Sequence, residues 1–395
     1  MNVHNNRLKS KFIFFYIIEP QINSGAKKKI ITQCKILSEL GYDVELCAVG
    51  NPNDLGFSNE FIRFVNIDFR KKIILLKRIF RGRKIANILN KYYLDLEYGD
   101  FFYFRYPCPI EYLPFRFFLR KKCFLIFEHN TIEPNEFRLN GIFSIGHIIE
   151  ILLGKPMRVQ SDGIVSVTDE ITRYELKRSG KLNKPHITIG NGLDVNSVPI
   201  RIAKPYVDTE LELHILCVAN VSKWHGLDRL LKGMATYCSN TCIIFHIAGE
   251  GAEIPLLKQL VEKLNLQDSV IFHGFKTGDE LDTLFNSCHI AVGSLGIHRI
   301  GLNEASILKA REYCARGIPY IIACADPDFP NDFPYIYRVP PDESPVDIEK
   351  IIEFAQTVCT DPDHPKKMRA YALEHLDWSA KMKKLKAFLE TLVDE

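Results

Sequence analysis

The sequence lacks the patterns that mark several large classes of protein. No apolar run reaches the roughly 18 residues that a membrane-spanning helix needs, and the opening MNVHNNRLKSK has no signal-peptide core. The 11 cysteines form no CxxC pair and the 12 histidines form no HxH or HExxH cluster, which excludes the usual zinc and redox motifs. A net charge of +3 gives no strong field for nucleic acid. We therefore expect a cytoplasmic protein with reduced thiols, no metal and no nucleic-acid partner.

The length of 395 residues exceeds one ordinary core and predicts about two domains. Apolar segments of strand length alternate with amphipathic segments of helix length in both halves, a pattern typical of parallel sheets covered on both faces. We expect a first Rossmann-like domain at 1–197, a linker at 198–212 and a second Rossmann-like domain at 213–377. An amphipathic helix at 378–395 ends the chain.

The most informative stretch is HRIGLNEASILKAREYCARGIPYII, at 298–322. It predicts a loop, a helix that begins near Asn303 and ends at Gly317, and then a buried strand. On that helix Glu304 and Glu312 would lie roughly 12 Å apart along the axis, which is the span of a nucleotide. Glutamates are also common on solvated helix faces, so the spacing alone leaves a surface role open.

A helix N-terminus presents unpaired N–H groups and partial positive charge, so it suits an anion such as a diphosphate. Arg299 precedes the predicted helix and would add charge, while Glu312 would accept the hydroxyls of a ribose. Glu304 would face the group carried by the far phosphate. The residues expected beneath the diphosphate are Asn303, Ala305 and Ser306.

The E-x7-E spacing before an A-x-G-x-P turn resembles the donor-site signature of family 4 glycosyltransferases, which have the GT-B fold. The matching residues are Glu304, Glu312, Ala315, Gly317 and Pro319. IGNGLD at 189–194 is similar to the IPNGVD turn between the two domains of that family. The resemblance implies two Rossmann-like domains that face a cleft, with the C-terminal helix crossing back to the first domain.

The same resemblance implies an activity. It is the retaining, metal-independent transfer of a hexose from a UDP- or GDP-sugar to a glycan acceptor, free or lipid-linked, in surface polysaccharide synthesis. No cofactor is expected, because the nucleotide sugar is a substrate. Two alternatives stay open: a catalytically silent GT-B protein that binds a glycan or a partner enzyme, and a sugar-nucleotide epimerase of the same fold.

Further candidate residues follow predicted strands. His129 ends a strand, and its flanks EHNTIEPNEFR resemble the acceptor-side loop of the family, where a histidine lies near the donor sugar. With Glu304 it is a candidate catalytic residue, although a structural role is the alternative. Gly249 and Gly251 in AGEG, and Gly25 after the first strand, would let backbone approach the nucleotide.

The chain departs from the family at the residues that usually grip the diphosphate. Many relatives carry arginine and lysine at positions that fall here on Asn220 and His225. We expect His225 and Lys223 to take part in donor binding instead. Other nearby cations could supply the charge from a shifted position: Arg229, Arg299 and Lys309.

The stretch RKKIILLKRIFRGRK, at 70–84, interleaves basic and large apolar residues and contains no acidic residue. Such a helix can lie on an anionic membrane surface, so a peripheral position on the inner face of the membrane is one prediction. A solvated helix whose apolar face enters the core is the alternative. The D-x-D of Asp326 and Asp328 resembles a metal-binding motif of other glycosyltransferases, but we do not expect a metal there.

Overall fold

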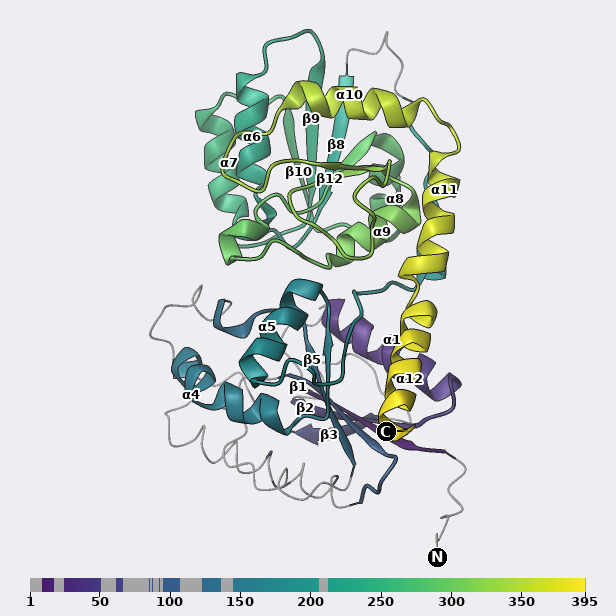
Figure 1. The fold of residues 1–395 in the computed structure, drawn as a ribbon. Coiled ribbons are helices and arrows are strands. Elements are labelled where there is room, and N and C mark those ends of the chain that lie inside the picture. Colours follow the sequence, from purple (N-terminus) through teal and green to yellow (C-terminus); the bar gives the residue numbers. More distant parts are fainter. Residues whose placement is uncertain are drawn as a thin grey trace, which may run out of the picture. The chain divides into compact units, whose positions relative to one another are not determined.

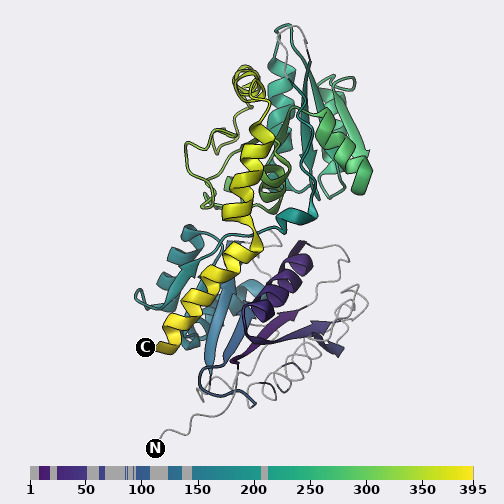
Figure 2. The ribbon, with the colours of Figure 1, turned by 90° about the vertical axis from the view of Figure 1, so that its right-hand side faces the viewer.

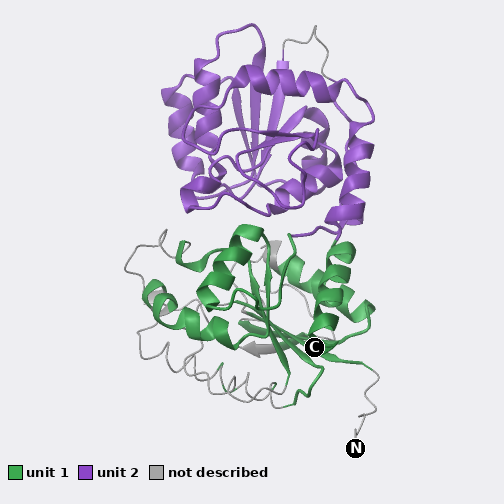
Figure 3. Cartoon of the chain, in the orientation of Figure 1, with its two compact units in different colours: residues 1–190, 378–395 green, residues 191–377 purple. Residues whose placement is uncertain are grey.

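Residues 9–17, 25–50, 62–66, 85, 87, 92, 95–106, 123–135, 145–205 and 212–394 are described by the structure, a computed structural model. The chain divides into two compact units (Figure 3), residues 1–190 with 378–395 and residues 191–377. The boundary therefore lies earlier than the expected residue 197. Arg201, expected in the linker, is buried in the second unit and donates to the carbonyl oxygens of Gly317 (3.0 Å) and His289 (3.2 Å).

The described residues of the first unit form a seven-stranded parallel sheet in the order β3-β2-β1-β4-β5-β6-β7. Figure 1 labels β1, β2, β3 and β5 of this sheet. Its strands are β1 (Lys11–Ile17), β2 (Asp43–Gly50), β3 (Ile62–Asn66), β4 (Phe101–Arg105), β5 (Phe124–His129), β6 (Gly163–Ser166) and β7 (His186–Thr188). Its longer helices are α1 (Gly25–Glu39), α4 (Ile145–Gln160), α5 (Asp169–Ser179) and α12 (Trp378–Asp394). The alternation of strand and helix confirms the parallel sheet predicted from sequence.

Both faces of the first sheet are apolar, because successive side chains of a strand point to opposite faces. Phe12 and Phe14 of β1 pack on the face covered by α1 and α12, whereas Ile13 and Phe15 belong to the core on the other face. The helix α12 lies beside α1 (Figure 2). Its apolar side buries Met382, Leu385, Phe388, Leu389 and Leu392. The C-terminal helix thus completes the core of the first unit, as predicted.

In the described part of the second unit, six parallel strands lie in the order β10-β9-β8-β11-β12-β13. They are β8 (Glu212–Val218), β9 (Cys242–Ala248), β10 (Val270–Gly274), β11 (Ile290–Val292), β12 (Tyr320–Ile322) and β13 (Ile336–Arg338). The helices are α6 (Leu227–Thr236), α7 (Ile254–Lys263), α8 (Gly278–Ser287), α9 (Leu308–Arg316), α10 (Ile348–Cys359) and α11 (His364–Tyr371). Apolar residues of α6, α7 and α10 pack on one face of this sheet.

The helix of the central stretch begins later than predicted. Asn303 O accepts from Ala325 N (2.9 Å) and Ala325 O accepts from Ala305 N (2.9 Å), so this segment runs extended beside the chain that follows β12. As a result α9 starts at Leu308, and Glu304 and Glu312 do not share one helix. The C-terminal end of α9 agrees with the prediction. Gly317 ends the helix with φ +81°, and a Cβ there would lie 2.3 Å from Pro365.

Two predictions concern the membrane. None of the helices in the described ranges is both long enough and apolar enough to cross a bilayer. The basic stretch at 70–84 lies outside the described residues, so its predicted membrane contact stays a prediction.

Candidate functional site

The sheet of the second unit has a topological switch point between β8 and β11. The chain leaves β8 toward β9 on one side, whereas β11 lies on the other side, so the loops after these two strands diverge. In open α/β sheets, ligands bind where such loops separate at the carboxyl ends of the strands. This edge carries the turns η5 (Lys223–His225) and η6 (Ile297–Ile300) and the start of α9. It is the candidate functional site.

Backbone hydrogen bonds join the loop after β8 to the loop after β11. Leu295 N donates to His225 O (2.9 Å), and Gly296 N donates to Trp224 O (3.1 Å). Gly226 has φ +61°, and a Cβ on it would lie 2.7 Å from the carbonyl carbon of Leu295. Close backbone packing therefore requires glycine here and fixes η5 against the loop after β11.

The glycines of AGEG are explained by packing within the protein. Gly249 has φ +135°, and its added Cβ would lie 1.9 Å from Ala219 O. Gly251 has φ +142°, and its added Cβ would lie 2.2 Å from Val221 O. The close approach is therefore to the loop after β8, which carries Asn220. The predicted contact of these glycines with a nucleotide stays a prediction, whereas their support of the loop is direct.

The N-terminus of α9 has no side-chain cap. Ile307 is its N-cap residue and no side chain caps the helix, so the first N–H groups lack the usual oxygen partner. Arg311 holds this end in place by donating to Ile307 O (3.2 Å) and to Asn191 O (2.8 Å). Asn191 N and Nδ2 in turn donate to Ser306 Oγ and O, both at 2.7 Å. The uncapped helix end therefore lies at 307–309 rather than at 303–306, and anion binding there stays a prediction.

Glu312, for which the sequence predicts a ribose contact, lies on α9, and that contact stays a prediction. It lies four residues into α9 and therefore about 6 Å along the axis from Leu308. Its side chain is 27% exposed, and its Oε1 accepts from Arg316 Nε (2.8 Å). Arg316 is itself held by Asp282 (2.6 Å). One oxygen of Glu312 is oriented by this pair, and the other can accept from a ligand.

Glu304 and Asn303 lie in the extended segment that pairs with Ala325. Glu304 is partly exposed, whereas Asn303 is exposed and does not cap α9. Ala305, Ser306 and Ile307 separate Glu304 from Leu308, the first residue of α9. The predicted role of Glu304 near the transferred group stays a prediction.

Two of the predicted cations are engaged elsewhere. Arg299 donates to Asp228 (2.8 and 3.0 Å), to Glu343 (2.8 and 2.6 Å) and to Lys223 O (3.0 Å), so all three of its nitrogens have protein partners. Arg229 is fully buried and donates to the carbonyl oxygens of Ser344 and Pro340, both at 2.9 Å. These arginines hold loops together. Lys223 is exposed on η5, and Lys309 lies on α9 itself.

His225 is buried on η5, and its ring has a defined proton position. Its Nδ1 accepts from Ser222 N (2.8 Å). Burial and the charge of Lys309 lower the pKa of His225 to about 2. The ring is therefore neutral near pH 7, and its proton lies on Nε2, which makes Nε2–H a hydrogen-bond donor. Asn220, at the other departing position, is exposed.

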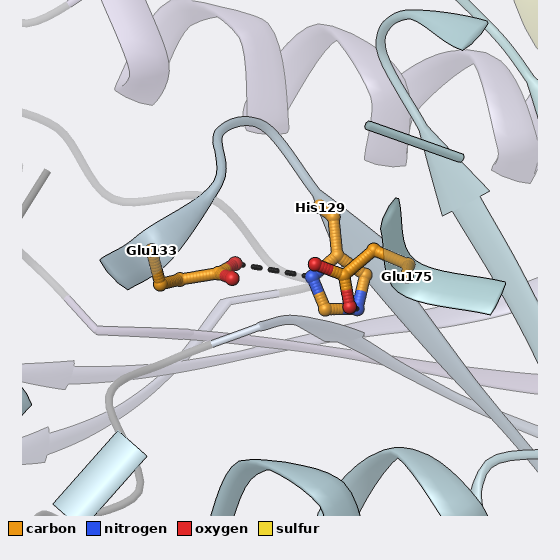
Figure 4. Close-up of side chains that lie close together, drawn as sticks. All are labelled: His129, Glu133 and Glu175. Atoms are coloured by element: carbon orange, nitrogen blue, oxygen red, sulfur yellow. Dashed lines mark hydrogen bonds and ion pairs between the residues drawn. The ribbon is translucent and has the colours of Figure 1, made fainter. Parts of the chain in front are cut away.

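His129 of the first unit ends β5 but does not reach solvent. Its ring is 0% exposed, stacks on Tyr106 (4.5 Å between centroids) and bonds through Nδ1 to Glu133 Oε1 (3.0 Å; Figure 4). Its Nε2 lies 3.4 Å from Glu175 Oε2. Burial lowers the pKa of His129 to about 4, so the ring is neutral near pH 7. Contact with a sugar would require these neighbours to move, and the predicted catalytic role stays a prediction.

The ligand-type atoms of His129, Glu133 and Glu175 lie within 4.8 Å of one another, a spacing that could hold a metal. The positively charged side chain of Arg158 already contacts both of these carboxylates, however. The fully buried Arg158 donates to Glu133 (2.8 Å), Glu150 (2.5 Å) and Glu175, and its guanidinium lies over the Tyr106 ring. The chemistry of this donor set is therefore that of a buried ion-pair network, which fixes α4 and α5 against the end of β5.

Sequence reasoning missed two features of these sites. Arg158 and its glutamates have no local motif, because they come from segments far apart in the chain. Arg311 was passed over inside the E-x7-E spacing, although it pairs with both carboxylates of the D-x-D, Asp326 and Asp328. An arginine on a helix that precedes a strand followed by D-x-D was the available signal. Gly25 is the first residue of α1, and its predicted approach to a ligand is not tested.

Residues 203–327 match the family model described as glycosyl transferases group 1. No curated protein matches the chain. The fold is similar to sucrose-phosphate synthase from Thermosynechococcus elongatus, with a TM-score of 0.69, 15% identity and coverage of 98% of this chain and 100% of that one. It is also similar to the lipopolysaccharide outer core galactosyltransferase WaaB (TM-score 0.66, 12% identity, 96% and 99% covered). A third similar structure is Anabaena HepE in complex with UDP and glucose, with a TM-score of 0.65, 14% identity and coverage of 97% of this chain and 100% of that one. At these identities the likeness shows the fold, so the chain has the two-domain GT-B fold with a group 1 glycosyl transferase segment in its second unit.

Proposed function

We propose that the protein is a family 4 glycosyltransferase that transfers a hexose from a UDP- or GDP-sugar to a glycan acceptor with retention of configuration. The observation that carries the proposal is the pairing of an uncapped α9 N-terminus with Glu312 one turn along the same helix, at the switch point of the second sheet. A phosphate at the helix end and a ribose at Glu312 match two adjacent parts of a nucleotide. The group 1 match over 203–327 includes both features.

The chemistry follows from where charge develops. Cleavage between the anomeric carbon and the diphosphate leaves negative charge on the leaving group, so donors that hold the diphosphate lower the barrier. In our proposal these donors are the first N–H groups of α9 and nearby cations, and no metal takes part. Glu304 and His129 are the proposed groups near the transferred sugar. The carboxylates of Asp326 and Asp328 are engaged by Arg311.

The proposed acceptor is a glycan, including one on a lipid carrier, in surface polysaccharide synthesis. The support is the resemblance of the central stretch to family 4 and the basic stretch at 70–84, which would hold the first unit against the inner face of the membrane. WaaB, a similar structure, is by its name a galactosyltransferase of the lipopolysaccharide outer core. The base, the sugar and the linkage are to be found by experiment.

The test is to incubate the protein with a panel of UDP- and GDP-sugars, with and without an oligosaccharide acceptor mixture, and to measure the released nucleoside diphosphate. A transferase releases UDP or GDP faster with acceptor, and NMR of the product should show the donor's anomeric configuration. An epimerase would convert the sugar without an acceptor. Glycan binding without any release from the panel would indicate a silent GT-B protein and contradict the proposal.

A further inference from the structure

Lys309 lies on the first turn of α9. Its Nζ is buried and has no hydrogen-bond partner among the residues that the structure describes. An isolated buried ammonium is costly unless another group compensates it. Burial lowers the pKa of Lys309, in agreement with an environment that disfavours its charge. Because such a group does not stabilise the fold, its presence points to a role in binding a ligand.

None of the described residues supplies a counter-charge to this amine. The groups that interact with it electrostatically are the thiols of Cys217, in β8, and Cys324, after β12. Burial raises the pKa of both thiols, to about 12 for Cys324, so they are neutral at physiological pH. The charge of Lys309 also acts on the buried ring of His225 and lowers its pKa. The amine thus lies by the carboxyl ends of the strands, near the switch point between β8 and β11.

The other cations of the site do not meet this need. Arg299 and Arg229 have their donors bound to protein oxygens, and Lys223 is exposed on η5. The two positions where the resembling family carries arginine and lysine hold Asn220 and the neutral His225. Of the four candidate cations considered, Lys309 is therefore the one whose charge is both buried and uncompensated.

We propose that Lys309 is the principal cation for the diphosphate of the nucleotide sugar, together with Nε2–H of His225 and the uncapped N–H groups of α9. The inference rests on the proposed function and names the ligands that take over from the usual arginine and lysine. One ammonium, one imidazole N–H and a helix end would converge on the leaving group. The four-carbon stem of Lys309 is partly exposed and flexible, so the amine can turn toward an anion that enters beside it.

The experiment is calorimetric binding of UDP, UMP, GDP and GMP to the full-length protein, to Lys309→Met and to the control Lys350→Met. Methionine keeps the length of the side chain and removes its charge, and Lys350 is an exposed lysine of α10 in the same unit. Loss of one charge-assisted hydrogen bond should weaken binding of the preferred diphosphate by about 10- to 100-fold in Lys309→Met. Binding of the matching monophosphate should weaken less, and Lys350→Met should bind as the wild type does.

A second readout separates a ligand-binding role from a structural one. Without nucleotide, Lys309→Met should unfold at a higher temperature than the wild type, because an uncompensated buried charge is removed. With diphosphate added, the wild type should gain thermal stability, whereas the variant should gain little. A lower unfolding temperature of the free variant would show that the amine is compensated, and it would overturn the inference.

The outcomes distinguish the two proposals. If the wild type binds UDP or GDP and Lys309→Met binds within about twofold of it, the role of Lys309 is refuted while the proposed function stands. If the wild type binds neither diphosphate at millimolar concentration, the proposed function fails and the role of Lys309 fails with it.

Discussion

Removal of the Arg311 guanidinium should destabilise the second unit more than any surface change. Arg311 is fully buried and pairs with Asp326, which is 3% exposed, and with Asp328. Arg311→Met would leave a buried carboxylate without its cation, which costs about 3 to 5 kcal/mol. It also removes the bonds to Asn191 O and Ile307 O, so the start of α9 would lose its support. The loss is a large part of the roughly 5 to 15 kcal/mol by which a domain is stable.

Urea unfolding followed by tryptophan fluorescence can measure this loss in one unit. The chain has two tryptophans, Trp224 in the second unit and Trp378 in the first. In a Trp378→Phe background, fluorescence reports on the second unit. The matched control adds Asp326→Asn and Asp328→Asn to Arg311→Met, which removes the uncompensated charge and should recover most of the lost stability. A loss below about 1 kcal/mol in Arg311→Met, or no recovery in the control, would refute the reasoning.

Four further predictions concern Glu312, Gly251, His225 and the basic stretch at 70–84. Glu312→Ala should weaken nucleotide binding at least about tenfold in calorimetry, because a carboxylate that accepts ribose hydroxyls is lost; unchanged affinity with the fold intact would contradict the assignment. Gly251→Ala should destabilise the second unit by at least about 2 kcal/mol in urea, because φ is +142° and the Cβ would lie 2.2 Å from Val221 O. The pKa of His225 is about 2 in the folded protein and near 6.5 in the unfolded chain, so below about pH 6.5 the unfolded chain binds a proton that the folded protein does not. The free energy of unfolding should therefore fall as the pH drops below about 6.5. In unfolding experiments across pH, His225→Gln should reduce the dependence of this free energy on pH by an amount that corresponds to at most one proton. Vesicles with anionic lipid should co-sediment the wild type at low salt and release it as salt rises, but not a variant with Lys71, Lys72, Lys77 and Arg78 changed to Gln; wild type that stays in solution would remove the membrane proposal.

The fold class could be predicted from sequence because hydrophobic patterning acts locally and repeats along the chain. Strand-length apolar segments such as 12–17 and 213–217 have to be covered on both faces, and the alternation with helices leaves parallel sheets as the solution. The end of α9 at Gly317 was also predictable, since a positive φ beside Pro365 favours glycine. The proposed roles of Glu312 and of this helix end in donor binding rest on the same local pattern.

The start of α9 could not be predicted, because a contact distant in sequence competes with the local capping signal. Asn303 is a good N-cap residue, yet its backbone pairs with Ala325, and this pairing keeps 303–305 extended. The domain boundary was displaced for a similar reason, since Arg201 finds carbonyl partners in the second unit. In both places backbone and side-chain hydrogen bonds across the fold outweigh local propensity.

The sequence by itself determined the kinds of groups available to this protein: parallel strands, a helix before a strand, glutamates at a fixed spacing and several cations near them. Only the tertiary structure decided which of those cations are free. Arg299 and Arg229 are both possible phosphate ligands by sequence, but each is bound to carboxylates or carbonyl oxygens supplied by other segments. Lys309 differs only in its surroundings, because its amine is buried where none of the described residues offers an acceptor. Charge is a property of a residue, whereas its availability depends on partners that folding brings from elsewhere in the chain.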